Sequence, residues 1–554
     1  MTLTDAAAAP RRRTAVVWLA CLLILGVRTA FLVKRGYVDG NLADPVPYDD
    51  ISYFSDALSR LNVLHASGIG TFLHDLGASP PHAVLSTAAA MLGFALSGNA
   101  TLAPYLVNAI LVGVLLIPIV TLVELPPLAS IGAFLAIVFA PFVDWAIMAF
   151  RPDFITGLMV AAVAAHLLFS DPSQQKPRRA FLLGCLGGAC LLSKPTASPA
   201  VAGLLIVAAM LVVAGNAIAS RQKSEAVKTH LAQGVLFSGL FLATSGLIFA
   251  IYLFFGWREL LSYIRTVMLD SPDIFALKLS LWDHIAYYLN LDALMLGYPG
   301  RPLALSAIVL IFAWLAGQKV NQISKIFLYV LFLGAAYILI TLPSVKTFFF
   351  GGIFYAGSLV LLTICLCCLI SFAVEKRQLA FVYLALPVIA ILNIVNYTDA
   401  QPKRDISIIR ISSLILDQVD DAIKHDLSLH SNRDGNRSNI RLLVVYPNPV
   451  ADRDFLFRLL QAGYLAESLE GLYINKDLDY WNNLALSADY TVVPDDRIVG
   501  TFPIGGLPIT ALAPQVNEFM KTAAGAVLVK DVETPDGHVY VYRRAEAAPD
   551  LPAR

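Results

Sequence analysis

The chain has 554 residues, of which 57% are hydrophobic and only 14% are charged, and its mean hydropathy is +0.69. Soluble globular domains carry about 25% charged residues, so this composition excludes an ordinary soluble protein. Basic and acidic residues both number 40, and this balance gives no indication of a nucleic-acid partner. All six cysteines lie in apolar stretches, which excludes a disulfide framework and a CxxC metal site.

Repeated apolar stretches predict membrane-spanning helices, because about 20 apolar residues cross ~30 Å of hydrocarbon. We therefore predict a polytopic α-helical membrane protein. Eleven spans are expected, at residues 14–33, 102–123, 128–148, 154–170, 180–193, 197–215, 231–255, 302–317, 326–342, 347–371 and 379–397. A further apolar run, 82–98, is short and follows two prolines. We expect it to be an embedded helix within the first outer loop.

The placement of lysine and arginine predicts the orientation, because these residues favour cytoplasmic connections. With 82–98 embedded, the alternate connections are 11–13, 124–127, 171–179, 216–230, 317–325 and 375–378. All are short and basic except 124–127, which has no basic residue. The N-terminus is therefore predicted to be cytoplasmic. Three segments are expected to face outward, at 34–101, 256–301 and 398–554, and the cysteine-free tail favours a bacterial inner membrane with a periplasmic domain.

The tail is predicted to be a soluble α/β domain, which divides the chain into a membrane domain, 1–397, and an extracytoplasmic domain, 398–554. Residues 440–446 read as a buried strand, and a helical stretch follows near 454–463. The segments 526–530 and 538–542 flank Thr534-Pro535-Asp536-Gly537, a turn sequence that predicts a hairpin.

Carboxylates stand beside apolar segments at two places on the predicted outer side. Tyr48-Asp49-Asp50 follows the first span, and Arg151-Pro152-Asp153 precedes another. A carboxylate beside hydrocarbon must be hydrated, paired or metal-bound. Either group can simply cap a helix, but two adjacent carboxylates repel each other unless a cation or a proton is involved. Such a carboxylate can act as general base on a hydroxyl acceptor or help to bind a divalent metal. Asp144 is a weaker acidic candidate.

Cations on the outer side are the second group of candidates. Lys194, in Ser193-Lys194-Pro195-Thr196, lies between two predicted spans. It either reaches the lipid headgroups or supplies a fixed cation for a phosphate at the membrane surface. Other outward cations include Arg301 and Lys346. His82 belongs to the first outer loop with two further histidines, whose spacing matches no metal site.

Four of these motifs together resemble the C-type (GT-C) glycosyltransferases, in particular the branch that contains protein O-mannosyltransferases and the lipid A aminoarabinose transferase. The matches occur in order within about the first 220 residues and are Tyr48-Asp49-Asp50-Ile51-Ser52-Tyr53, Ser79-Pro80-Pro81-His82, Arg151-Pro152-Asp153-Phe154 and Leu192-Ser193-Lys194-Pro195-Thr196. They are similar to the family's acidic pair, Pro-Pro motif, second acidic motif and lysine motif. The acidic residue that the aminoarabinose transferase type carries before Pro-Pro is absent from Gly77-Ala78-Ser79.

The resemblance implies an inverting transfer of a sugar from a polyprenyl-phosphate donor to a glycan, lipid or protein acceptor. Asp49 would be the general base, with Asp50 beside it, and Asp153 would organise the acceptor side or a divalent metal held with Asp49. Lys194 would hold the donor phosphate, with Arg151, Arg301 and Lys346 as further phosphate contacts. Tyr48 and His82 would neighbour the substrates.

Other functions stay open at this stage. The main alternative is a secondary transporter or lipid flippase, although the charged residues cluster at outer ends and no internal repeat is visible. A surface-glycan polymerase or ligase and a non-catalytic subunit of an envelope complex are further alternatives.

Overall fold

The computed structural model describes residues 3–40, 42, 46, 48–98, 100–220, 227–265, 277, 279–290, 323–344, 346–375, 391, 406–430, 440–445, 452–469, 475–495 and 508–545. The chain divides into two compact units. Unit 1 comprises residues 1–32, 79–89 and 105–402, and unit 2 comprises residues 33–78, 90–104 and 403–554. Most of the first outer loop thus belongs to the same compact unit as the C-terminal region.

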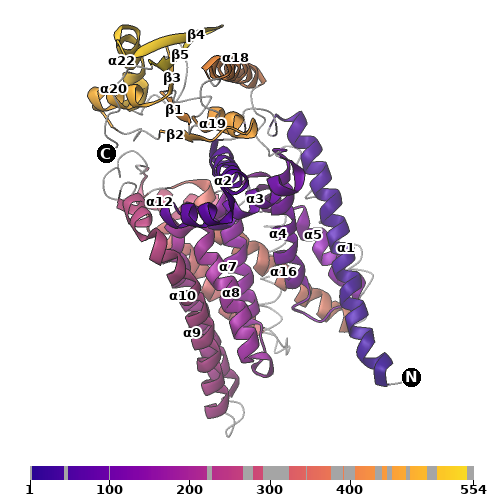
Figure 1. Ribbon diagram of the computed structural model, residues 1–554. Coiled ribbons are helices and arrows are strands. Elements are labelled where there is room, and N and C mark those ends of the chain that lie inside the picture. Colours follow the sequence, from indigo (N-terminus) through magenta and orange to yellow (C-terminus); the bar gives the residue numbers. More distant parts are fainter. Residues whose placement is uncertain are drawn as a thin grey trace. The chain divides into compact units, whose positions relative to one another are not determined.

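Unit 1 is helical. Its elements are α1 (Leu3–Val38, whose end enters unit 2), α4 (Ala103–Val120), α5 (Pro127–Val138), α6 (Pro141–Met148), α7 (Pro152–Leu168), η1 (Pro172–Gln174), α8 (Pro177–Ser193), η2 (Pro195–Ala197), α9 (Ser198–Ser220), α10 (Val227–Arg265), α12 (Leu281–Asn290), α15 (Ile323–Thr341), η4 (Phe348–Gly351) and α16 (Gly352–Glu375). The helices α7, α8, α9 and α10 pack along one another (Figure 1).

The prediction of a polytopic helical membrane protein is confirmed. Six described helices are long and apolar enough to cross a membrane, at Thr14–Val38, Ala103–Val120, Pro195–Ile218, Thr229–Arg258, Ile323–Thr341 and Phe349–Val374. The predicted spans 154–170 and 180–193 correspond to α7 and α8, which have 17 residues each. The predicted spans 302–317 and 379–397 lie outside the described residues, so a total of eleven spans stays a prediction.

The predicted span 128–148 is bent. Its residues form α5 and α6, two helices bent by 73° at the break between them. Proline has no backbone N–H to donate, so Pro141 is tolerated at the first position of α6 but not inside a continuous helix. The two helices together are apolar enough to form one bent span, so this span stays a prediction.

Small residues let the helices of unit 1 approach backbone to backbone, as is common between membrane helices. A Cβ added at Gly157 of α7 would lie 2.4 Å from the carbonyl oxygen of Gly352 at the start of α16. A Cβ at Gly352 would in turn lie 2.7 Å from the carbonyl oxygen of Asp153. The first turns of α7 and α16 are therefore held in direct main-chain contact.

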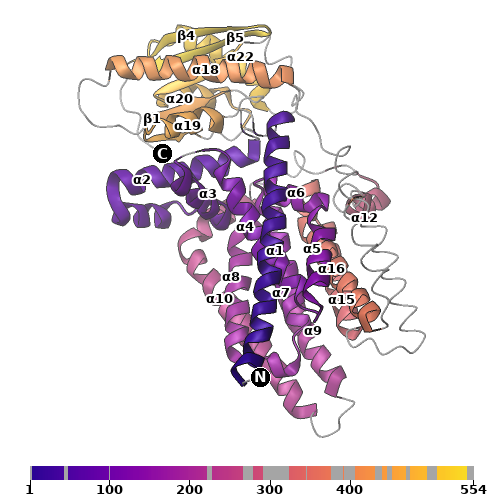
Figure 2. The same cartoon turned by 90° about the vertical axis from the view of Figure 1, so that its right-hand side faces the viewer.

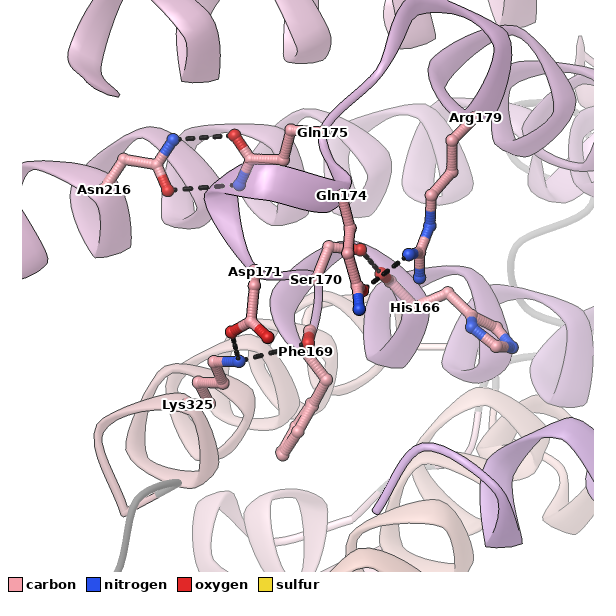
Figure 3. A network of polar contacts seen from close by, with 9 residues as sticks. All are labelled: His166, Phe169, Ser170, Asp171, Gln174, Gln175, Arg179, Asn216 and Lys325. Carbon is pink, nitrogen blue, oxygen red and sulfur yellow. Dashed lines mark hydrogen bonds and ion pairs between the residues drawn. The ribbon is translucent and has the colours of Figure 1, made fainter. Parts of the chain in front are cut away.

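Polar bonds join three of the predicted cytoplasmic connections at one end of unit 1 (Figure 3). The buried amides of Gln175 and Asn216 bond reciprocally, at 2.7 and 3.1 Å, and Asn216 Nδ2 also donates to the carbonyl of His230 at 3.0 Å. Lys325 Nζ donates to Asp171 Oδ1 at 2.6 Å. The connections 171–179, 216–230 and 317–325 thus share one end of the bundle, as predicted, while the orientation across a membrane stays a prediction.

Unit 2 contains the predicted α/β fold. Its elements are α2 (Tyr48–Ala78), the end of α3 (Val84–Ser97), α18 (Ile406–His430), β1 (Ile440–Val444), α19 (Asp452–Gln461), β2 (Ala466–Ser468), α20 (Leu478–Ser487), β3 (Tyr490–Pro494), α22 (Pro508–Thr522), β4 (Ala526–Thr534) and β5 (Gly537–Arg544). The strand order is β2-β1-β3-β5-β4, with β1 parallel to β2 and β3 and with β5 antiparallel to β3 and β4. Helix α18 lies along β4 and β5 (Figure 2), and the predicted hairpin is confirmed.

Helix α2 is built onto the C-terminal region of unit 2. Ser55 Oγ donates to the carbonyl of Arg453 at 3.1 Å, and Asn62 Nδ2 donates to the carbonyl of Leu460 at 3.0 Å. The ring of Phe54 packs against that of Phe457 with centroids 6.2 Å apart. These contacts bond α2, the helix of the first outer loop, to the helix α19. The first turn of α2 carries the acidic pair.

Substitution of Gly157 by alanine should destabilise the protein by about 1–3 kcal/mol, because the added methyl group meets the main chain of Gly352 and forces two helices apart. The measurement is thermal unfolding in detergent. Gly334→Ala in α15 is the matched control, since a Cβ there meets nothing within 4 Å and alanine restricts the unfolded chain. Equal melting temperatures for the two variants would contradict the close contact.

Candidate functional site

Arg151 and Asp153 are placed by the start of α7. Arg151 is the extended residue before the helix, Pro152 occupies its first position and Asp153 lies in its first turn. A carboxylate in the first turn is stabilised by the partial positive charge of the helix N-terminus. The sequence Arg-Pro-Asp thus sets one cation and one anion side by side where an apolar helix begins.

Lys194 is placed by the end of α8. It is the residue after Ser193, the last helical residue, and it is followed by Pro195 and the short helix η2. Lys194 Nζ donates to Asp153 Oδ1 at 2.6 Å, and the two side chains are 13% and 11% exposed. The structure therefore joins two of the sequence-predicted site residues in a nearly buried ion pair.

A pair of hydroxyl groups links the two helix ends that carry Asp153 and Lys194. The hydroxyls of Thr156 and Ser193 lie 2.6 Å apart, and each has a main-chain carbonyl within reach, that of Pro152 for Thr156 and that of Cys190 for Ser193. Since a hydroxyl has one proton, one of the two donates to the other, which in turn donates to its own carbonyl. Because Thr156 lies one turn into α7 and Ser193 ends α8, this link fixes the two helix ends that carry Asp153 and Lys194.

Two phenylalanine rings cover the cations. The guanidinium carbon of Arg151 lies 4.2 Å from the ring centroid of Phe349, and Lys194 Nζ lies 4.6 Å from that of Phe350. Both rings come from η4, immediately before the glycine contact between α16 and α7. Cation–π contacts of this kind stabilise a charge at a low-dielectric surface without neutralising it.

Lys346 caps a helix in the structure. Its ammonium donates to the carbonyls of Ile340 and Thr341, at 3.2 and 2.7 Å, at the C-terminal end of α15. The residue is 3% exposed, and its ammonium lies 5.2 Å from the ring centroid of Tyr288 in α12. Burial lowers the pKa of Lys346 to about 8. Its contact with a donor phosphate stays a prediction.

The remaining candidates are distributed as follows. Tyr48 and Asp49 begin α2 in unit 2, and their side chains lie outside the described part of the chain. Asp50 is 2% exposed in the same turn. His82 is exposed in the turn before α3, and Arg301 lies outside the described residues. Asp49 and Asp50 belong to unit 2 and Asp153 to unit 1, so their sharing of one site stays a prediction.

Asp144 has a structural role that the sequence did not indicate. Both of its carboxylate oxygens accept from Arg28 Nη2 at 2.6 Å, and the two side chains are 1% exposed. The ring of Phe139 lies 4.8 Å from the guanidinium carbon. This closed pair joins α6 to α1, so Asp144 is not an open acidic group.

The described residues offer no ready set of metal ligands. Within them there is no group of three or more histidine, cysteine, aspartate or glutamate side chains placed to hold an ion. The carboxylate of Asp153 faces a lysine. A divalent metal held by Asp49 and Asp153 therefore stays a prediction, and no chemical step below depends on it.

The cluster in unit 1 combines cations with aromatic rings. Arg151 and Lys194 lie against the rings of Phe349 and Phe350, Lys346 lies beside the ring of Tyr288, and Lys194 is paired with Asp153. Sequence reasoning missed Phe349 and Phe350, because a phenylalanine run at the end of a predicted span is not distinguishable from the apolar span itself.

Comparisons with solved structures confirm the predicted resemblance for the fold. The structure of ArnT from Cupriavidus metallidurans bound to undecaprenyl phosphate matches at 12% identity over 99% of each chain, with a TM-score of 0.51. The apo structure of the same protein matches at 13% identity over 97% of this chain and 98% of that chain, with a TM-score of 0.52. No protein-family model and no curated protein matches the sequence.

An oligosaccharyltransferase from Archaeoglobus fulgidus, crystallised in complex with Zn and sulfate, is a weaker match. It has 13% identity over 93% of this chain and 73% of that chain, with a TM-score of 0.42.

Replacement of Lys194 by glutamine should destabilise the protein by about 3 kcal/mol, because it leaves the carboxylate of Asp153 nearly buried and unpaired. The double variant Asp153→Asn/Lys194→Gln should recover most of this loss in thermal unfolding experiments. Lys521→Gln is the control, since it breaks the Lys521–Glu518 pair of the same 2.6 Å length at an exposed position, where such pairs contribute ~1 kcal/mol or less.

The stability of the protein should rise with pH above about 8 because of Lys346. The pKa of Lys346 is lowered from 10.5 to about 8 in the folded protein, so between these values the unfolded chain binds more protons at this site. The melting temperature of the wild type relative to Lys346→Met should therefore increase between pH 8 and 10.5. The exposed variant Lys176→Met should keep the wild-type slope, and a flat difference for Lys346→Met would show that its pKa is ordinary.

Proposed function

We propose that this protein is an inverting membrane glycosyltransferase that moves a sugar from a polyprenyl-phosphate donor to a glycan, lipid or protein acceptor at the outer face of the membrane. The proposed location is the inner membrane of a bacterium, with the N-terminus in the cytoplasm and the C-terminal domain in the periplasm. The support is the cluster of Arg151, Lys194 and Asp153 beside the rings of Phe349 and Phe350, in a fold shared with a protein solved bound to undecaprenyl phosphate.

In this proposal the cations stabilise the negative charge that develops on the phosphate leaving group. The acceptor hydroxyl attacks the anomeric carbon as the bond from that carbon to the phosphate oxygen breaks. The electron pair of that bond stays on the phosphate, so negative charge develops there. Fixed positive charges at the site of developing charge lower the barrier. Lys194 and Arg151 have this role in the proposal, and Asp153 holds Lys194 in place through the 2.6 Å bond.

The proton of the acceptor hydroxyl needs a base, and Asp49 is the proposed one. Attack from the face opposite to the phosphate inverts the anomeric configuration. Helix α2, which begins with Tyr48 and Asp49, is bonded to α19 through Ser55 and Asn62. In this proposal the soluble region therefore sets the position of the base, in addition to any contact that it makes with the acceptor.

The alternative of a secondary transporter or lipid flippase has less support. Transporters use ionisable groups near the middle of the bilayer. Here Arg151 and Lys194 flank helix ends, and the buried pair Arg28–Asp144 is closed on itself with 2.6 Å bonds. These placements favour chemistry at the membrane surface over passage through it.

The test is mass spectrometry of envelope glycans and glycolipids from a strain that lacks the protein. Wild-type protein should restore a specific sugar, and Asp49→Asn should restore less than about 1% of it, because loss of a general base costs 10²- to 10⁴-fold. Asp479→Asn is the matched control, since Asp479 is an exposed carboxylate in the first turn of another outer helix, α20. Full restoration by Asp49→Asn would exclude the proposed base and favour the transport reading.

A further inference from the structure

Tyr288 of α12 has a buried hydroxyl that makes no hydrogen bond to any residue that the structure describes. The residue is 0% exposed. Burial of a hydroxyl without a partner costs free energy, so such a group in a native structure needs an explanation. A bound ligand that accepts a hydrogen bond is one explanation, and the surroundings of Tyr288 favour it.

The ring of Tyr288 is firmly held, so its hydroxyl is not unpaired through looseness of the side chain. Tyr355 Oη donates to the main-chain carbonyl of Tyr288 at 3.1 Å, and the two rings pack edge to face with centroids 6.5 Å apart. A Cβ added at Gly351 would lie 2.8 Å from Tyr288 Cδ1. The contact with the start of α16 therefore leaves the ring no room on that side.

One cation of the candidate site lies beside the same ring. The ammonium of Lys346 lies 5.2 Å from the ring centroid. Burial, and then the negative charges of Tyr287 in its ionised form and of Asp153, raise the pKa of Tyr288 above its ordinary value. The phenol consequently stays protonated at neutral pH and offers one O–H donor. A donor without an acceptor among the described residues, beside the ammonium of Lys346, is complementary to an anion whose oxygens only accept.

We propose that the Tyr288 hydroxyl donates a hydrogen bond to a phosphate oxygen of the polyprenyl-phosphate donor. This inference rests on the proposed function and adds α12 to the donor site. Tyr288 binds the phosphate in this scheme and takes no part in proton transfer. A phosphate oxygen supplies the acceptor that this hydroxyl lacks among the described residues.

The experiment compares the full-length wild type with Tyr288→Phe in detergent, using undecaprenyl phosphate as the probe. The affinity of the variant should fall about tenfold or more, because a hydrogen bond to a charged group is lost. Its melting temperature without lipid should stay equal or rise, since an unpaired hydroxyl is removed from the interior. A purely structural role would lower both quantities together.

Two controls separate the possible causes. Tyr287→Phe removes the hydroxyl of the neighbouring, partly exposed tyrosine and should bind undecaprenyl phosphate as the wild type does. Undecaprenol, which has the same chain without the phosphate, should bind equally to wild type and Tyr288→Phe. A loss of undecaprenol binding would show that the ring, not the hydroxyl, contacts the lipid, and would overturn the inference.

The outcomes also distinguish this inference from the proposed function. If the wild type binds undecaprenyl phosphate and Tyr288→Phe binds it equally well, the hydroxyl does not contribute to lipid binding. The inference then fails, while the proposed donor stands. If the wild type does not bind the lipid at all, the proposed donor and the inference both fail. A drop in melting temperature that accompanies weaker binding assigns Tyr288 a structural role and overturns the inference.

Discussion

An aspartate at the start of one apolar helix and a lysine at the end of the following helix face a common constraint, because neither charge can stay beside hydrocarbon without a partner. The 2.6 Å bond between Lys194 and Asp153 meets this constraint for both. Since each residue is fixed to a helix terminus, the bond also sets the separation of α7 and α8 at that end. The placement of Arg151 and of the rings above it depends on that separation.

Unit 2 also contains bonds that fix a helix carrying candidate residues. Helix α2 lies in the first outer loop by sequence, yet its bonds run to the backbone of α19 almost 400 residues later. The helix that begins with the acidic pair is therefore held by bonds to α19, a helix distant in the sequence.

Much of the fold could be predicted from local sequence patterns, whereas contacts between residues that are distant in the sequence could not. Apolar length predicted helices such as α4 and α16, and the turn sequence before Gly537 predicted the hairpin. The order of motifs predicted that Asp153 and Lys194 face the same side, but not that they bind each other, because that depends on how α7 packs against α8. The buried hydroxyl of Tyr288 was not predictable either, since it lies in a segment with no motif and its isolation is a property of the packed structure.

The reciprocal amide pair of Gln175 and Asn216 has a consequence for how the two ends of the bundle respond to their surroundings. Its bonds are buried and carry no net charge, so neither salt nor ordinary changes of pH alter them, and the charged Asp171–Lys325 bond beside it is exposed and weak. The opposite end is held by a nearly buried ion pair. Salt therefore weakens the exposed Asp171–Lys325 bond but leaves the amide pair intact, and it screens the nearly buried Lys194–Asp153 pair much less than an exposed one. The helix ends joined by Gln175 and Asn216 consequently stay together when ionic conditions change.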